Sequence, residues 1–347
     1  MSTLVADVAG TLARAGEEEQ LGHWAAAARL YAQAFRASSL RGDVEEAADA
    51  LRGQARVLVR EERYEEAEEL ASLSLEIAER SGAARSVARA VNVLGIIRHS
   101  QRDWRTSQEH FRRAVELALD LGDDELVGLA CQNAGVIAYG LGDLREARSA
   151  YLESIGSFVR SGSSENALHA YNNLGIACAD LREWLESDVY FSRGIEIAER
   201  LSHTPLLAKL YGNRAEPLIE IGDLDAAAAT VARAESAASA VGDRVALGVA
   251  LRWRSKVARL RGDFTLAEAS VEHALAVATD PTLERAEILL ELGDLRAQQG
   301  RTADAEAAYL QSRELSESLA AEGQVRELDA RIRSLHHGGH LSASPDP

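Results

Sequence analysis

The chain has 347 residues, and its 38 Lys and Arg against 55 Asp and Glu give a formal net charge of −17. This charge repels phosphate backbones and anionic lipids, so nucleic acids and membranes are excluded as general partners. Its only cysteines, Cys131 and Cys178, lack the Cys-x-x-Cys spacing of metal and redox sites, and the N-terminus lacks the pattern of a secretory signal, so we expect a cytoplasmic protein with reduced thiols.

A small residue returns every forty residues over most of the chain. It occupies Ala15, Ala55, Gly95, Gly135, Gly175, Ala215 and Ser255, and it returns two residues early at Gly293. Twelve residues later stands a second small residue, and sixteen residues later most copies have a larger apolar one, as in Gly135, Ala147 and Tyr151. A period of this length is typical of a helical solenoid whose repeats are hairpins of two helices.

The period predicts eight helical hairpins in chain order. We place them at residues 4–41, 44–81, 84–121, 124–161, 164–201, 204–241, 244–280 and 282–319. An amphipathic helix over residues 322–336 is expected to cover the last exposed apolar face, as the ends of solenoids require. Residues 337–347 are predicted to form a disordered tail.

Each hairpin is predicted to turn seven residues after its small residue. The turn positions are Gly22, Gly142, Gly222, Gly262 and Gly300, with Glu62, Arg102 and Arg182 in the other copies. Glycine is favoured at helix ends because it adopts the left-handed conformation without a Cβ clash. Aspartate often follows, as at Asp143, Asp223 and Asp263, where its side chain is expected to cap the second helix.

From about residue 4 to residue 319 this pattern resembles the tetratricopeptide repeat family, in a form with roughly forty residues per repeat. The likeness shows in Asn173-Leu174-Gly175 followed by Ser187 and Phe191. The resemblance implies an all-α fold, a right-handed α-solenoid whose concave wall is formed by the first helix of each hairpin. It also implies that an extended peptide or protein segment binds along this wall.

Carboxamides form a column on the predicted concave wall. Asparagine stands two residues before the small residue in three successive repeats, and further amides lie one place earlier; the six residues are Asn133, Asn173, Asn213, Asn92, Gln132 and Asn172. An amide both donates and accepts, so it pairs with the N–H and C=O groups of a peptide without reading its side chains. The column resembles the asparagine ladders of kinesin light chains, Pins-type scaffolds and bacterial peptide receptors. The alternative is that these amides cap neighbouring helices of the protein itself.

Basic side chains gather on the same wall of an otherwise acidic protein. They are Arg52, Arg56 and Arg89 in the second and third repeats, Lys209 in the sixth, and Arg252 and Lys256 in the seventh. We expect them to attract a partner with acidic side chains or a free carboxylate. The alternative is that they pair with acidic residues of the protein itself.

Five further residues of the first helices bear on the predicted groove. Tyr139 and His169 belong to the predicted binding residues, and Trp253 replaces the asparagine of the preceding repeats, where it either stacks on a ligand or packs between repeats. Glu216 is expected to project into the groove and to anchor a basic side chain or pair with Lys209. Pro217 lies inside the first helix of the sixth repeat. Because proline lacks the N–H of a helical hydrogen bond, we expect either a hinge at the groove or a tolerated bend.

The sequence contains no phosphate loop, dinucleotide glycine pattern, zinc-type spacing or nucleophile elbow. We therefore predict a non-enzymatic scaffold, without catalytic residues, cofactor or metal, that holds an extended protein or peptide segment in its concave groove. Two alternatives stay open. One is a peptide- or ligand-gated sensor that acts through a separate effector partner, and the other is an accessory protein that binds its partner with the outer surface.

Overall fold

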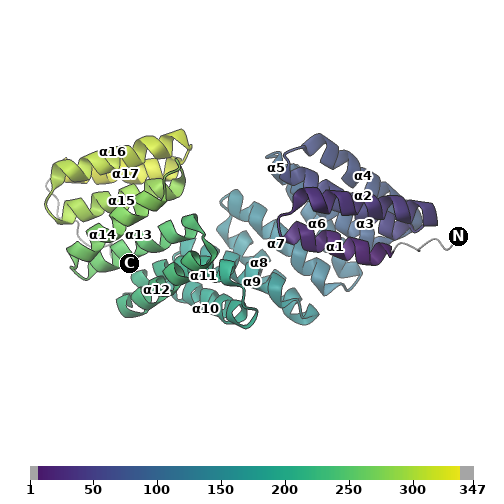
Figure 1. Ribbon diagram of the computed structural model, residues 1–347, viewed down its shortest axis with the longest axis horizontal. Helices are drawn as coiled ribbons and strands as arrows, with labels where there is room; N and C mark the ends of the chain where they lie inside the picture. The colour runs from purple at the N-terminus through teal and green to yellow at the C-terminus, as the bar shows by residue number, and fades with distance from the viewer. Residues whose placement is uncertain (1–6, 337–347) are drawn as a thin grey trace. The chain divides into compact units, whose positions relative to one another are not determined.

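The computed structural model describes residues 7–336, apart from the side chain of Gln20. Over these residues the chain forms 17 α-helices and no strand (Figure 1). The all-α class predicted from the repeat period is confirmed. The chain divides after Ala177 into two compact units, which we call unit 1 and unit 2. The tail predicted at residues 337–347 lies outside the described residues, as does the start of the first predicted repeat.

Unit 1 contains four complete hairpins, each made of a first and a second helix. They are α1 (Val8–Gln20) with α2 (Trp24–Arg41), α3 (Val44–Arg60) with α4 (Tyr64–Ser81), α5 (Ala84–Ser100) with α6 (Trp104–Asp120), and α7 (Asp124–Gly140) with α8 (Leu144–Ser161). The first helices also contact one another in order, α1 with α3, α3 with α5, and α5 with α7. The next helix, α9 (Ser164–Asp180), contains the division between the units.

Unit 2 continues the same pairing and ends in a single helix. Its members are α10 (Trp184–Arg200), α11 (Thr204–Glu220) with α12 (Leu224–Val241), α13 (Arg244–Leu260) with α14 (Phe264–Val277), α15 (Leu283–Gln298) with α16 (Thr302–Ser318), and α17 (Glu322–His336). The last helix packs against α16 and buries Leu328 there. Its opposite side is polar and exposed, for example at Arg326 and Arg333, as suits the end of a stack. No helix within residues 7–336 is long and apolar enough to span a bilayer.

The helix ends follow from the turn residues. All eight predicted turn positions have a positive φ, including Glu62, Arg102 and Arg182 at 60°, 62° and 59°. The left-handed conformation is therefore set by the hairpin and is kept even where the residue is not glycine. The predicted caps are confirmed as well, because Asp143 and Asp223 each accept a hydrogen bond from the N–H three residues ahead.

The small residues of the first helices allow the second helices to approach closely. A Cβ added at Gly95 would lie 2.7 Å from the ring of Phe111, sixteen residues later in the chain. At Gly293 the corresponding distance to the ring of Tyr309 is 2.3 Å. A larger side chain would need the ring or the helix to move, which explains why the position recurs as glycine, alanine or serine.

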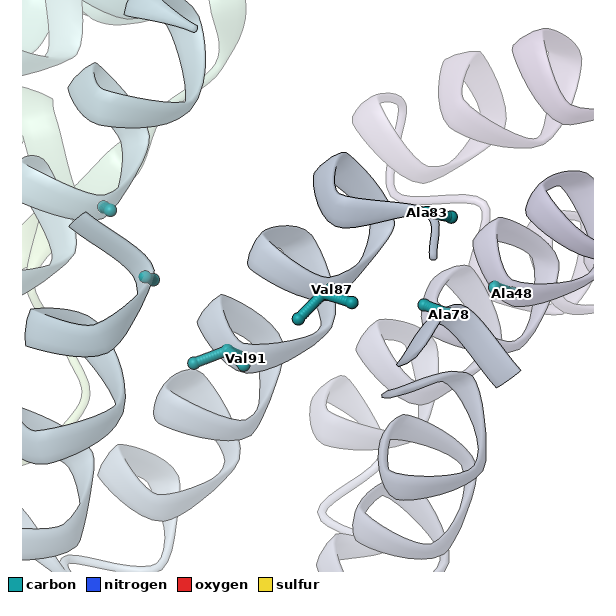
Figure 2. Close-up of a cluster of buried hydrophobic side chains, with 7 residues drawn as sticks. Ala48, Ala78, Ala83, Val87 and Val91 are labelled. Atoms are coloured by element: carbon teal, nitrogen blue, oxygen red, sulfur yellow. The ribbon is translucent and has the colours of Figure 1, made fainter. Parts of the chain in front are cut away.

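Alanine and valine also fill the space between neighbouring hairpins. In unit 1 one buried cluster joins Ala48 of α3, Ala78 of α4 and Val87 and Val91 of α5 (Figure 2). The two valines lie on successive turns of one helix face, with the alanines on the neighbouring helices (Figure 2). Close packing of these small side chains holds the first helices side by side and so presents a continuous first-helix face within the unit.

Candidate functional site

The first helices present the same register positions to two hollows, one in each unit. Counted from the small residue of a first helix, these positions lie six, three and two residues earlier and one residue later. They are occupied by Arg89, Asn92, Val93 and Ile96 in α5, and by Glu287, Leu290, Glu291 and Asp294 in α15. We call this register the first-helix face, and we describe its two hollows separately.

The hollow of unit 1 has a volume of about 470 Å³ and lies over α3, α5 and α7. Its apolar lining includes Val93, Ile96, Leu126 and Leu129. Its polar lining consists of Arg52, Arg56, Arg89, Asn92, Asn133 and Glu125, of which all but the glutamate were predicted from the sequence. The hollow thus combines an apolar surface with arginines and amides.

Two arginines of the unit 1 hollow share one carboxylate. Arg52 lies 2.5 Å from Asp49 in an ion pair, and Arg89 lies 3.6 Å from the other oxygen of the same side chain. The Arg52 side chain is only 11% exposed. Its burial, reinforced by the positive charges of Arg56 and Arg89, lowers the pKa of Arg52 to about 10. The ionic partners within unit 1 therefore leave this pair of guanidinium groups short of negative charge.

Arg56, by contrast, is fully engaged within the protein. It donates two hydrogen bonds to Glu19 of α1, at 2.8 and 2.6 Å, and a third to the hydroxyl of Tyr31 at 3.0 Å. Burial works against its charge, but the contact with Glu19 outweighs this and raises the pKa of Arg56. Arg56 therefore pairs with an acidic residue of the protein itself, which was the alternative to ligand binding in the sequence analysis.

The amides of the unit 1 hollow contact each other. Nδ2 of Asn133 donates to Oδ1 of Asn92 at 3.0 Å and so links α7 to α5. Nδ2 of Asn92 and Oδ1 of Asn133 have no partner within residues 7–336, which leaves one donor and one acceptor of this amide pair unused. The next two amides also meet, because Asn172 donates to Asn173 at 3.4 Å. The column is therefore partly bonded to itself.

The hollow of unit 2 has a volume of about 340 Å³ and is more highly charged. It is lined by residues of α11, α13, α15 and α17, and five of these are the carboxylates Glu216, Glu287, Glu291, Asp294 and Glu327. Three are basic, Arg252, Lys256 and Arg331. The predicted residues Arg252, Trp253 and Lys256 are thus brought together here, in a setting more acidic than their own charges suggest.

Every basic side chain of the unit 2 hollow has an acidic partner. Arg252 lies 3.1 Å from Glu284 and 2.7 Å from Glu287. Lys256 lies 3.5 Å from Glu220. Arg331 reaches from α17 to Asp294 at 2.5 Å and also contacts Glu327 at 2.9 Å. All of these ion pairs lie within unit 2.

A buried ion pair supports the floor of the unit 2 hollow. Arg259 donates two parallel hydrogen bonds to Glu291, both at 2.8 Å, and the two side chains are 6% and 5% exposed. Asp294 lies beside them and accepts a hydrogen bond from the Tyr309 hydroxyl at 2.7 Å. Burial lowers the basicity of Arg259, but Glu291 and Asp294 outweigh it, so the pKa of Arg259 is raised.

Trp253 is part of the core of unit 2 as well as of the hollow. It is 6% exposed and packs in a cluster with Leu218, Val231 and Val257. The Arg252 guanidinium lies 4.2 Å from its ring centre, which is a cation–π contact. The structure therefore agrees with packing between repeats and shows a ring that is already covered by a cation of the protein.

Glu216 is the carboxylate of the unit 2 hollow that lacks a partner. It is half-buried and forms no hydrogen bond or ion pair within residues 7–336. Burial raises the pKa of Glu216, and the negative charges of Asp180 and Glu220 add to this, although Lys256 and Arg252 act in the opposite direction.

The remaining predicted residues line neither hollow. They are Gln132, Tyr139, His169, Asn172, Asn173, Lys209 and Asn213. Tyr139, His169 and Lys209 are exposed, whereas Gln132 buries its Oε1 atom without a hydrogen-bond partner in the described chain. Pro217 is buried inside α11, which runs as one helix from Thr204 to Glu220 and so accommodates the proline.

Sequence reasoning missed much of the unit 2 lining. Glu287, Glu291 and Asp294 hold in α15 the register by which residues of earlier helices were selected, so the same count from Gly293 would have found them. Leu290 of α15 was missed as well, and the remaining missed residues lie in α17, outside the repeat; they are Gln324, Glu327 and Arg331. The forty-residue repeat does not extend into that helix, so a count from a small residue could not have found them.

Two stretches of the chain, one in each unit, match models of a known repeat family. Residues 46–120, in unit 1, and residues 254–320, in unit 2, each match a model described as Tetratricopeptide repeat. A comparison with curated proteins gave no match.

Three solved structures show the same fold at low sequence identity. BtubC (BKLC) from P. vanneervenii is 22% identical, with a TM-score of 0.55 over 62% of this chain and 91% of that chain. A Rap protein complexed with competence and sporulation factor is 13% identical, with a TM-score of 0.57 over 96% and 98% of the two chains. The apo form of the quorum sensor NprR from B. thuringiensis is 12% identical, with a TM-score of 0.54 over 95% and 99%.

Proposed function

The chain belongs to the tetratricopeptide repeat family, and we propose that it is a non-enzymatic protein that binds an extended protein or peptide segment on its first-helix face. The observation that supports this most directly is the hollow of unit 1, where unsatisfied amide groups lie beside two arginines that share one carboxylate. The partner therefore binds at the first-helix face, and binding at the outer surface is the alternative.

The amides supply contacts to the backbone of the bound segment. The free donor of Asn92 pairs with a peptide C=O, and the free acceptor of Asn133 pairs with a peptide N–H. Their mutual hydrogen bond fixes both side chains before the ligand arrives, so little side-chain entropy is lost on binding. Backbone contacts of this kind give affinity without selecting a sequence.

The arginines and the apolar lining supply selectivity. Arg52 and Arg89 share Asp49, so an acidic side chain or a free carboxylate of the partner completes their charge balance. Ile96 and Leu129 line the same hollow and offer an apolar surface to a neighbouring side chain of the segment. We therefore propose that the segment bound in unit 1 presents an acidic group next to an apolar side chain.

A random peptide library displayed on phage tests the proposal. Peptides selected on the whole chain are synthesised with a fluorophore, and their dissociation constants are measured by anisotropy. Changing Asn92 and Asn133 together to Ala is expected to weaken binding about tenfold, whereas Asn166→Ala, on α9 but in neither hollow, leaves it unchanged. Failure to select any peptide, or equal affinities for all three proteins, refutes binding at this face.

A second reading, a peptide-gated regulator that acts through an effector protein, is favoured by one observation. The likeness to the Rap complex and to NprR extends over 96% and 95% of this chain. A regulator changes conformation when the peptide binds, whereas a scaffold does not need to. Small-angle scattering of the chain with and without a selected peptide separates the two, because a change in the radius of gyration is expected of the regulator alone.

A further inference from the structure

The charge balance of the unit 2 hollow is distinct from that of unit 1. When the lining residues are taken together with their ion-pair partners Glu220, Glu284 and Arg259, seven carboxylates face four basic groups. Three negative charges are therefore in excess in a partly enclosed space. In such a space a neighbouring cation is attracted more strongly than at an open surface, because water screens the charges less.

None of the four basic groups forms an ion pair with Glu216. Lys256 is directed to Glu220 on the same helix as Glu216, and Arg252 bridges two glutamates of α15. Arg259 and Arg331 are occupied by Glu291 and Asp294. Each basic group is thus directed to an acid other than Glu216, and the Glu216 carboxylate has no ion pair within residues 7–336.

We propose that the hollow of unit 2 binds a basic side chain, lysine or arginine, of the partner polypeptide, with Glu216 as its ionic contact. The assignment rests on the proposed function, because it names a residue of the segment that occupies the first-helix face. Leu290 and Trp253 line the same hollow and contact the aliphatic stem that separates a lysine or arginine head group from its backbone.

The same chemistry disfavours a bare metal ion as the occupant. No group of three or more His, Cys, Asp or Glu side chains within residues 7–336 is arranged to hold a metal ion. The acids of the hollow are instead spread over three helices, α11, α15 and α17, and interleaved with arginines and a lysine. A side chain that brings one positive charge on a long apolar stem matches this spacing better than a compact divalent ion.

The peptide library provides the test. Selection on the wild-type chain is expected to enrich lysine or arginine at one peptide position, and Glu216→Gln is expected to abolish that enrichment and to weaken a selected basic peptide about tenfold. Glu272→Gln is the matched control, because Glu272 is exposed on α14 and lines neither hollow. A version of the selected peptide with the basic residue replaced by norleucine should bind wild type and Glu216→Gln equally.

The outcomes separate this inference from the function on which it rests. Selected peptides without a basic position, or a basic position unaffected by Glu216→Gln, overturn the inference and leave peptide binding standing. A library that yields no binder refutes both. Spermidine serves as a free cation, and if it competes with the peptide only when Glu216 is intact and binds as tightly as the peptide, the occupant is a small polyamine and the inference is wrong.

Discussion

The hollows of unit 1 and unit 2 use the same register of the repeat and have opposite imbalances of charge. In unit 1 two arginines, Arg52 and Arg89, depend on the single carboxylate of Asp49. In unit 2 the carboxylate of Glu216 forms no ion pair within residues 7–336, although three basic residues line the hollow. The repeat therefore decides which positions face a hollow, and the pairing among neighbours decides which sign of charge is left for a ligand.

The two hollows also differ in how their ion pairs are supported. The Arg259–Glu291 pair of unit 2 is 6% and 5% exposed, whereas the Arg56–Glu19 pair of unit 1 is 31% and 20% exposed. Removing one partner of a buried pair leaves the other charge without water or counter-ion, so the cost rises steeply with burial. Unit 2 is thus the unit whose hollow depends more on electrostatic support.

The largest effect is expected from Arg259→Ala. The substitution leaves Glu291 buried and unpaired and should lower the free energy of unfolding by about 3 kcal/mol. Arg56→Ala in unit 1 is the comparison and should cost clearly less, because its ionic partner Glu19 is 20% exposed and keeps access to water. Urea unfolding followed by circular dichroism measures both. Equal costs would show that the two networks do not differ as their burial suggests.

The next effect concerns the close approach behind each hollow. Gly293→Ala places a Cβ 2.3 Å from the ring of Tyr309 and should destabilise the protein by about 2 kcal/mol. Gly95→Ala, at 2.7 Å from Phe111, should cost somewhat less. Gly16→Ala in α1 has nothing within 4 Å and is expected to stabilise by about 1 kcal/mol through helix propensity. Thermal unfolding of the three variants checks the order, which a loss of stability in Gly16→Ala would contradict.

Neutralising Asp49, which pairs with two arginines of the unit 1 hollow, and neutralising Glu216 of the unit 2 hollow should change stability in opposite directions. Asp49→Asn leaves Arg52 and Arg89 without their carboxylate and is expected to cost about 1 kcal/mol. Glu216→Gln removes an unpaired, half-buried charge and is expected to stabilise by about 1 kcal/mol at neutral pH. The same sign of change in both variants would remove the contrast between the hollows.

The gain from Glu216→Gln should depend on pH. Because the folded-state pKa of Glu216 is raised, its carboxyl binds a proton more readily in the folded than in the unfolded protein. The loss of folding stability caused by the charged Glu216 carboxylate is therefore complete at neutral pH, and it declines as the pH falls through the folded-state pKa. At about pH 4, near the ordinary glutamate pKa, wild type and variant should converge in stability. A constant difference across this range would show that the charge of Glu216 is not the cause.

The smallest effect is expected at Glu327, on the rim of the unit 2 hollow. Its side chain is 51% exposed, and Arg331 keeps Asp294 as a partner when it is lost. Glu327→Gln should therefore change the free energy of unfolding by less than about 0.5 kcal/mol. A larger loss in urea unfolding would indicate that α17 is held in place mainly by this contact.

Residue patterns were sufficient for the local structure and for part of the candidate site. The predicted turns at Glu62 and Arg102 have the expected positive φ, although neither residue is glycine. Arg89 and Asn92 were selected by register and do line the unit 1 hollow. Lys209, selected in the same way, lines neither hollow, because register tells which side of a helix a residue occupies but not where neighbouring helices leave space.

The sequence by itself determined the helical hairpins, their turns and the small residues at close contacts, because these depend on residues within one repeat. Only the tertiary structure decided which charges are neutralised. Arg56 pairs with Glu19, which is 37 residues away in the sequence, and Arg331 pairs with Asp294 at the same sequence separation. A salt bridge between neighbouring hairpins depends on the lengths and rotamers of two side chains that face each other, and a repeat period does not specify those. The charge left over for a ligand is therefore a property of the folded stack.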